Sequence, residues 1–225
     1  MTIMNDSMIK YIDTEIIPRY DEFDAAHRVD HARTVMSQAM TLLDGLQHWL
    51  SQQTSPDPVW LEPVERDMLL MAAACHDLGL VNGRDNHHMD SGKIIRADMR
   101  LREWFSEEQI EVIAQAAEDH RASGKSRPRD LYGMIVAEAD RVIDTETIIR
   151  RTLQYGLKNY PQLDMEGHVA RAMEHLHEKY GRGGYLKLWI PWSDNAVRLS
   201  RLHDLIDDED KLRAEVFRIC SEMHL

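Results

Sequence analysis

The sequence predicts a single all-α domain over residues 1–225, and three observations indicate it. Apolar residues recur at helical spacing along most of the chain, and no segment shows the sustained two-residue alternation of a half-buried strand. Residues that interrupt helices are scarce, with 11 Gly and 7 Pro. The 43% hydrophobic and 29% charged residues are typical of a globular protein rather than a disordered one.

The helices are predicted from their periodicity and their end signals. In order, they cover about residues 5–17, 26–50, 63–79, 87–101, 106–121, 130–157, 164–180, 194–206 and 208–223. Pro18 stops the first, and Pro63 lies in the first turn of the third. Gly79 is expected to form the C-cap of the third helix, and Ser106 with Gln109 caps the start of the fifth.

Charge, hydropathy and cysteine content indicate which partners and which cellular compartment to expect. The 27 Lys and Arg against 39 Asp and Glu leave a net charge of −12, which argues against a broad nucleic-acid surface. No apolar run is long enough to cross a membrane, and the first residues lack the pattern of an export signal. Two cysteines are too few for a disulfide framework. We expect a cytoplasmic protein, and the sequence leaves a homodimer open.

The 12 histidines are unusual, and several of them border apolar helix faces. Metal-competent side chains on such faces occur on four of the predicted helices: His31, His76, Asp77, His120 and Asp140. An inward-facing carboxylate is costly unless it is paired or bound to a cation. A mixed imidazole and carboxylate set suits Zn, Fe, Mn or Ni. The sequence therefore predicts a shared cation site in the interior.

The order of these residues resembles a known family. His31, then His76-Asp77, then Asp140 is similar to the H…HD…D pattern of HD-domain metal-dependent phosphohydrolases. The surrounding segments are similar as well: Val29–Val35, Cys75-His76-Asp77-Leu78-Gly79 and Glu138-Ala139-Asp140-Arg141. The resemblance covers about residues 20–160, the predicted metal-binding core, and leaves about residues 161–225 as a C-terminal helical extension.

Many subfamilies with this pattern hold a second metal through two further histidines. His88, four residues before Gly92, and His120, four residues before Gly124, fit those positions. His87 is the rival, and His88 is preferred for its spacing to Gly92. The resemblance thus implies one or two divalent ions, with Asp77 between them; Fe, Mn, Zn, Ni, Co and Mg all stay open.

The implied reaction is hydrolysis of a phosphate ester or anhydride in a small phosphorylated metabolite, such as a nucleotide. Five basic residues are expected to bind the substrate phosphate: Lys93, Arg96, Arg121, Lys125 and Arg127. Asp77, Lys93 and Arg121 are the predicted catalytic residues. Asp77 or a metal-activated water is expected to be the base and nucleophile.

Two other functions stay open. The same scaffold is used by di-iron oxygenases that resemble myo-inositol oxygenase, and some HD-related domains are non-catalytic interaction modules. All four core ligands of the pattern, His31, His76, Asp77 and Asp140, are present, which disfavours a non-catalytic interaction module. Trp189 and Trp192, on either side of Pro191, are either core residues or a pocket wall.

Overall fold

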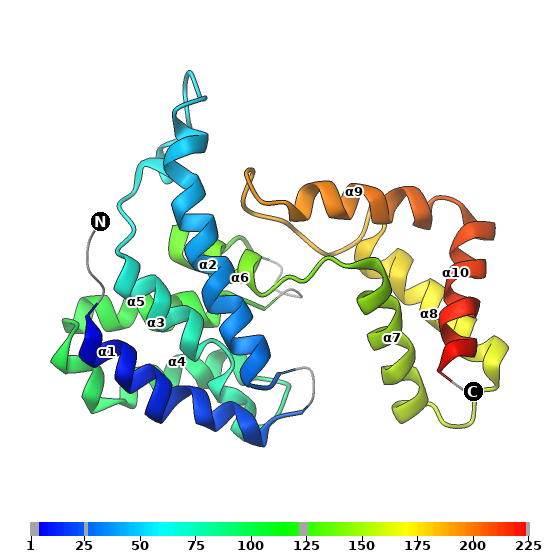
Figure 1. Ribbon diagram of the computed structural model, residues 1–225, viewed down its shortest axis with the longest axis horizontal. Helices are drawn as coiled ribbons and strands as arrows, with labels where there is room; N and C mark the ends of the chain where they lie inside the picture. Colours follow the sequence, from blue (N-terminus) through cyan, green and yellow to red (C-terminus); the bar gives the residue numbers. More distant parts are fainter. Residues whose placement is uncertain (1–4, 25–26, 122–125, 224–225) are drawn as a thin grey trace. The chain divides into compact units, whose positions relative to one another are not determined.

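The computed structural model describes residues 5–24, 27–121 and 126–223, and all of its regular elements are helices (Figure 1). This confirms the predicted all-α class. The chain divides into two compact units, one comprising Met1–Arg141 with Trp189–Ser193 and the other Val142–Leu188 with Asp194–Leu225. The first unit ends at Arg141 rather than near residue 160, where the sequence suggested the limit of the core.

In its described residues, the first unit contains six α-helices joined by short helical turns. Their bounds are α1 Asp6–Tyr11, α2 Val29–Leu50, α3 Arg66–Cys75, α4 His87–Ala97, α5 Glu107–Glu118 and α6 Leu131–Ala139. The turns between them are η1 Ile12–Ile16, η2 Ile17–Glu22, η3 Pro58–Leu61, η4 Leu78–Asn82 and η5 Met99–Glu103. Pro18 does not end the first helical segment, because it occupies the first turn of η2, where a missing N–H costs nothing.

Two central helices are apolar on every side. All residues of α6 are buried, and so are the residues of α3 from Met68 to Cys75. A helix without a polar face has to be surrounded by other elements. Helix α3 packs against α2, α5 and α6, and α6 also packs against α2 and α5. Residues at the C-terminal ends of α3 and α6 are therefore delivered into the interior of the unit.

The second unit, as far as residue 223, consists of four helices, α7 Thr145–Asn159, α8 Met165–Tyr180, α9 Asn195–Ile206 and α10 Glu209–Glu222. The sequence predicted one helix over 130–157, and that prediction was wrong. Helix α6 ends at Ala139, and a new helix, α7, begins after Asp144. The Asp144 side chain accepts a hydrogen bond from the backbone N–H of Thr147 at 2.9 Å. An Asp N-cap satisfies a helix-start donor, and this favours a break over continuation.

Gly79 has a different role from the predicted C-cap. It lies in η4, and a Cβ on it would be 2.0 Å from the carbonyl oxygen of His87 and 2.5 Å from the amide nitrogen of Ser91. The absence of a side chain thus lets η4 lie directly against α4. The Gly79 N–H donates to the Ser91 hydroxyl at 2.8 Å and fixes this contact.

Replacing Gly79 with alanine should destabilise the protein by about 2–3 kcal/mol or more, because backbone atoms of α4 would have to move. Urea unfolding followed by circular dichroism measures the change. Gly183→Ala is the matched control, since a Cβ there meets nothing within 4 Å. Equal stability of the two variants would contradict the packing argument.

No helix in the described part of the chain combines the length and apolar character that a membrane span requires.

Candidate metal centre

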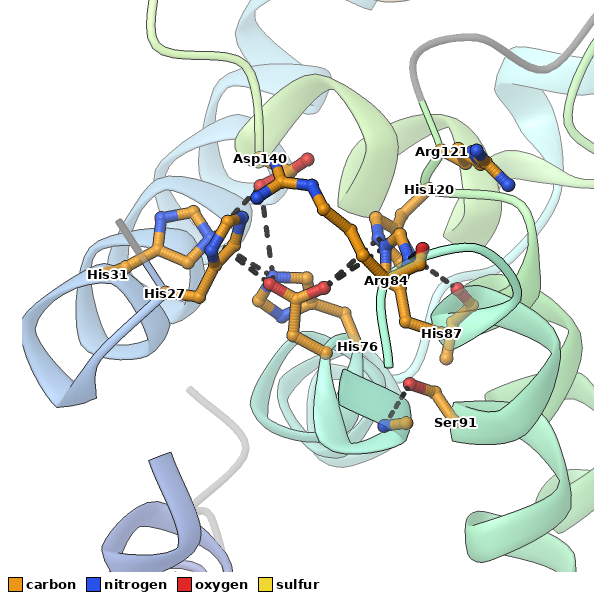
Figure 2. Close-up of polar contacts among 12 residues, drawn as sticks. His27, His31, His76, Arg84, His87, Ser91, His120, Arg121 and Asp140 are labelled. Carbon is orange, nitrogen blue, oxygen red and sulfur yellow. Dashed lines mark hydrogen bonds and ion pairs between the residues drawn. The ribbon is translucent and has the colours of Figure 1, made fainter. Parts of the chain in front are cut away.

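Three helices of the first unit bring one group of ligand atoms together. His31 lies in the first turn of α2, His76 directly follows α3, and Asp140 directly follows α6. His31 Nε2 is 3.1 Å from Asp140 Oδ1 and 3.3 Å from His76 Nε2. One ligand atom from each residue lies within 4.8 Å of the others (Figure 2). We refer to these three residues as the first group.

A second group forms beside it from Asp77, His87 and His120. His87 opens α4, and His120 follows the end of α5. Their Nε2 atoms are 3.2 Å apart, and each is 3.4 Å from Asp77 Oδ1. His120 and Asp77 are almost fully buried.

Asp77 lies between the two groups and directs one oxygen to each. Its Oδ2 is 3.3 Å from His76 Nε2 and 3.6 Å from His31 Nε2, while Oδ1 faces His87 and His120. Tyr20 holds the turn that carries this carboxylate, because its hydroxyl accepts the Asp77 N–H and donates to the Ala74 carbonyl oxygen. A carboxylate in this position can bridge two cations.

The histidine rings are oriented as metal ligands require. The Nδ1 atoms of His76, His87 and His120 each contact a backbone carbonyl oxygen, on Ala73, Arg84 and Ala117 respectively. Such a contact places the hydrogen on Nδ1, so that the Nε2 lone pair points into the cluster. Imidazole nitrogens facing each other at 3.2–3.3 Å need a proton or a cation between them. The residues present therefore fit a pair of divalent ions.

Without a cation, protons would hold the cluster together. Burial raises the pKa of Asp77, but the neighbouring His76, His120 and His31 outweigh this and keep it well below its usual value. Burial likewise opposes the ionisation of Asp140, and the surrounding imidazoles lower its pKa. Burial lowers the pKa of His31, yet Asp140 and Asp77 raise it to about 9.

His88, which the sequence favoured over His87, lies in neither group. The choice of His88 is therefore corrected to His87. On α4 the buried positions are Ser91, Gly92 and Ile95, so stepping back four residues leads to His87 from Ser91 and to His88 from Gly92. Helical spacing leaves both histidines open, and the three-dimensional geometry selects His87, whose Nε2 lies 3.4 Å from Asp77 Oδ1. Gly92 serves another contact, because a Cβ there would collide with the Glu118 side chain.

His87→Ala should lower the affinity for one divalent ion by at least about tenfold, whereas His88→Ala should leave both affinities close to wild type. The reason is that only His87 directs Nε2 at Asp77 and His120. Isothermal titration of the metal-free protein with Co²⁺ distinguishes the two variants. The reverse order of effects would restore His88 as the ligand.

Two of the basic residues predicted to bind substrate are directed elsewhere. Arg96 forms a bidentate ion pair with Glu111 and a further one with Glu118, which occupies its guanidinium. Lys93 is on the exposed side of α4 and pairs with Asp90 at 2.8 Å. The structure thus offers no support for Lys93 as a catalytic residue or for either residue as a phosphate ligand.

Arg121 is the predicted cation that lies near the second group. It contributes to lowering the pKa of both His87 and His88, after the larger effect of burial, and its guanidinium donates to the Asp85 carbonyl oxygen. Arg127 is exposed, with its guanidinium 3.8 Å from the sulfur of Met134. Lys125 lies outside the described residues.

Two further residues, His27 and Arg84, were not among the predicted site residues. The His27 ring lies 5.7 Å from the His31 ring, and its Nδ1 is 2.8 Å from Asp24 Oδ1. Arg84 contacts the other oxygen of Asp24 at 3.4 Å, and in the view of Figure 2 its side chain passes across the two groups. The spacing of four residues between His27 and His31 was the available signal.

Comparison with known proteins identifies the family. Residues 28–143, just over half of the chain, match the family described as HD domain. The chain belongs to the HD-domain family. The resemblance seen in the sequence is thereby confirmed, and the matched region contains both groups of the metal centre. No curated protein and no solved structure matches this HD domain significantly. HD domains bind divalent metals and are mostly hydrolases, although some members are not enzymes.

Proposed function

We propose that this HD domain is a metal-dependent phosphohydrolase acting on a small phosphorylated metabolite such as a nucleotide. One observation carries the proposal: six side chains form two adjacent ligand groups, and the carboxylate of Asp77 faces both. His31, His76 and Asp140 would hold one divalent ion, and His87 and His120 the other, with Asp77 between them. Bound divalent ions lower the pKa of water and neutralise charge on phosphoryl oxygens.

The protein's own residues then bind and orient the substrate. Arg121 lies beside the second group and supplies a donor for a phosphoryl oxygen, as guanidinium groups commonly do. Both oxygens of Asp77 are directed at ligand groups, so this carboxylate would hold the ions and would not be free to act as the base. Arg121 and the bound divalent ions would provide local positive charge, which allows an anionic substrate to bind to a protein whose net charge is −12.

Elemental analysis of anaerobically purified protein, followed by a screen of phosphorylated metabolites, tests the proposal. We expect about two equivalents of transition metal per chain and release of inorganic phosphate or a phosphorylated product that EDTA abolishes. Oxygen-dependent turnover with a visible iron spectrum would favour a di-iron oxygenase instead. Protein that binds no divalent ion would contradict both enzymatic functions and favour an interaction module.

A further inference from the structure

Five residues from far along the chain complete the unit that contains the metal centre. Trp189–Ser193, which we call the strap, belong to the first unit, although the chain before and after them belongs to the second. The strap lies beyond the residues that match the HD-domain family. Within the strap, Ile190 is only 2% exposed and Ser193 is also buried, Trp189 and Trp192 are half-buried, and Pro191 is exposed.

One end of the strap is attached to α2. The indole N–H of Trp192 donates to the Leu42 carbonyl oxygen at 2.8 Å. Its ring packs against Trp49, with centroids 5.0 Å apart, and against Trp60, with centroids 5.4 Å apart. Gly45 provides the space, since a Cβ there would be 3.0 Å from Trp192 Cδ1. Trp192 is thus half-buried and packs against the core, which favours the first of the two roles left open by the sequence.

The other end of the strap is attached to α6. The backbone N–H of Trp189 donates to Glu138 Oε2 at 2.9 Å. Glu138 is fully buried and lies two residues before Asp140. A buried carboxylate needs such partners, so the contact fixes the last turn of α6.

We infer that the strap holds α2 and α6 together and thereby keeps His31 and Asp140 at ligand distance. The inference rests on the proposed metal centre. His31 comes from α2 and Asp140 from α6, and their facing atoms are 3.1 Å apart. A cation requires ligand atoms placed within a few tenths of an ångström, so a loosened α6 would weaken the first group. Glu138 is a positioning residue here.

The second group provides an internal reference. Asp77, His87 and His120 follow or open α3, α4 and α5, and the contacts of Trp189 and Trp192 described above are made with other elements. Disturbing the strap should therefore weaken one of the two ions and spare the other. A general loss of stability would affect both.

The test titrates metal-free, full-length variants with Co²⁺ by calorimetry. Glu138→Ala should weaken one Co²⁺ equivalent by about tenfold or more and leave the other unchanged. Glu138→Gln keeps an oxygen that accepts the Trp189 N–H and should restore binding. If Glu138→Ala does not fold, Trp192→Phe carries the test. Its control is Trp104→Phe, which removes an indole N–H bonded to Ser7, outside the strap.

Hydrogen exchange of the metal-free protein gives a readout that requires no ion. In Glu138→Ala or Trp192→Phe, peptides covering 131–145 should exchange faster, because the Asp140 N–H that bonds to Val136 would open more often. Folded variants with wild-type exchange and wild-type Co²⁺ affinities would overturn the inference. A wild type that binds no Co²⁺ would instead contradict the proposed function and the strap's role in cation binding. Hydrogen exchange would then report only whether the strap stabilises α6.

Discussion

Asp77→Asn should abolish both tight binding of divalent ions and phosphohydrolase turnover, with a loss of at least about a thousandfold in kcat/KM. Among the residues that the structure describes, Asp77 is the only one whose carboxylate directs an oxygen at each group. Asparagine keeps the size but removes the charge, so four imidazoles would have to hold two dications with Asp140 as the sole carboxylate. Metal analysis, calorimetry and turnover measure the result.

The control for this substitution is Asp90→Asn. Asp90 lies on α4 but belongs to neither ligand group, and its carboxylate pairs with Lys93 and hydrogen-bonds the Asn82 side chain. It should retain metal and activity. The circular dichroism of both variants should match the wild type, which separates loss of the centre from loss of the fold. Wild-type turnover in Asp77→Asn would show that catalysis does not use this centre.

The helix positions and the inward-facing ligands could be predicted from sequence because both depend on local periodicity. His31, His76, Asp140 and His120 follow apolar faces at helical spacing, and the structure brings all four into the cluster. The error at His88 has the same origin. Two histidines are adjacent there, and a rotation of one residue, about 100° around the helix, decides which one faces inward.

Contacts between distant segments could not be predicted in this way. The Arg96 guanidinium is not free to bind a phosphate because it is paired with Glu111 and Glu118. These two residues lie on another helix, whose rotation is set by packing. The hydrogen bond between Trp189 and Glu138 joins residues 51 positions apart and places part of the C-terminal half in the unit that contains the candidate metal centre. Neither periodicity nor motif spacing contains that information, since it arises from tertiary packing.

Removal of the divalent ions should lower the melting temperature. The difference in melting temperature between the metal-bound and the metal-free protein should grow as pH rises from 6.5 toward 9. A bound ion stabilises the native state by mass action, by about 2.7 kcal/mol at one hundred times Kd. Ligation requires imidazoles without a proton on Nε2, so protons compete with the ion. The pKa of His31 is raised from 6.5 to about 9 by Asp140 and Asp77, which outweigh burial.

The raised pKa of His31 determines the direction in which stability changes with pH. In the metal-free protein, protonated His31 stabilises the fold fully below pH 6.5, and that contribution is lost as pH rises through about 9. The metal-bound protein has no such loss, because His31 is already deprotonated. The difference between the two forms should therefore widen by up to about 3 kcal/mol, or roughly 5–10 °C in Tm.

Thermal unfolding with Co²⁺ or with EDTA, repeated at several pH values under anaerobic conditions, measures this widening. His31→Gln should remove most of it, since the variant lacks the titrating imidazole. His48→Gln is the control on the same helix, where the exposed ring contacts Gln52 and lies far along α2 from His31. A metal effect that is constant with pH in the wild type would mean that protons and the cation do not compete at His31, and the first group would then not be a cation site.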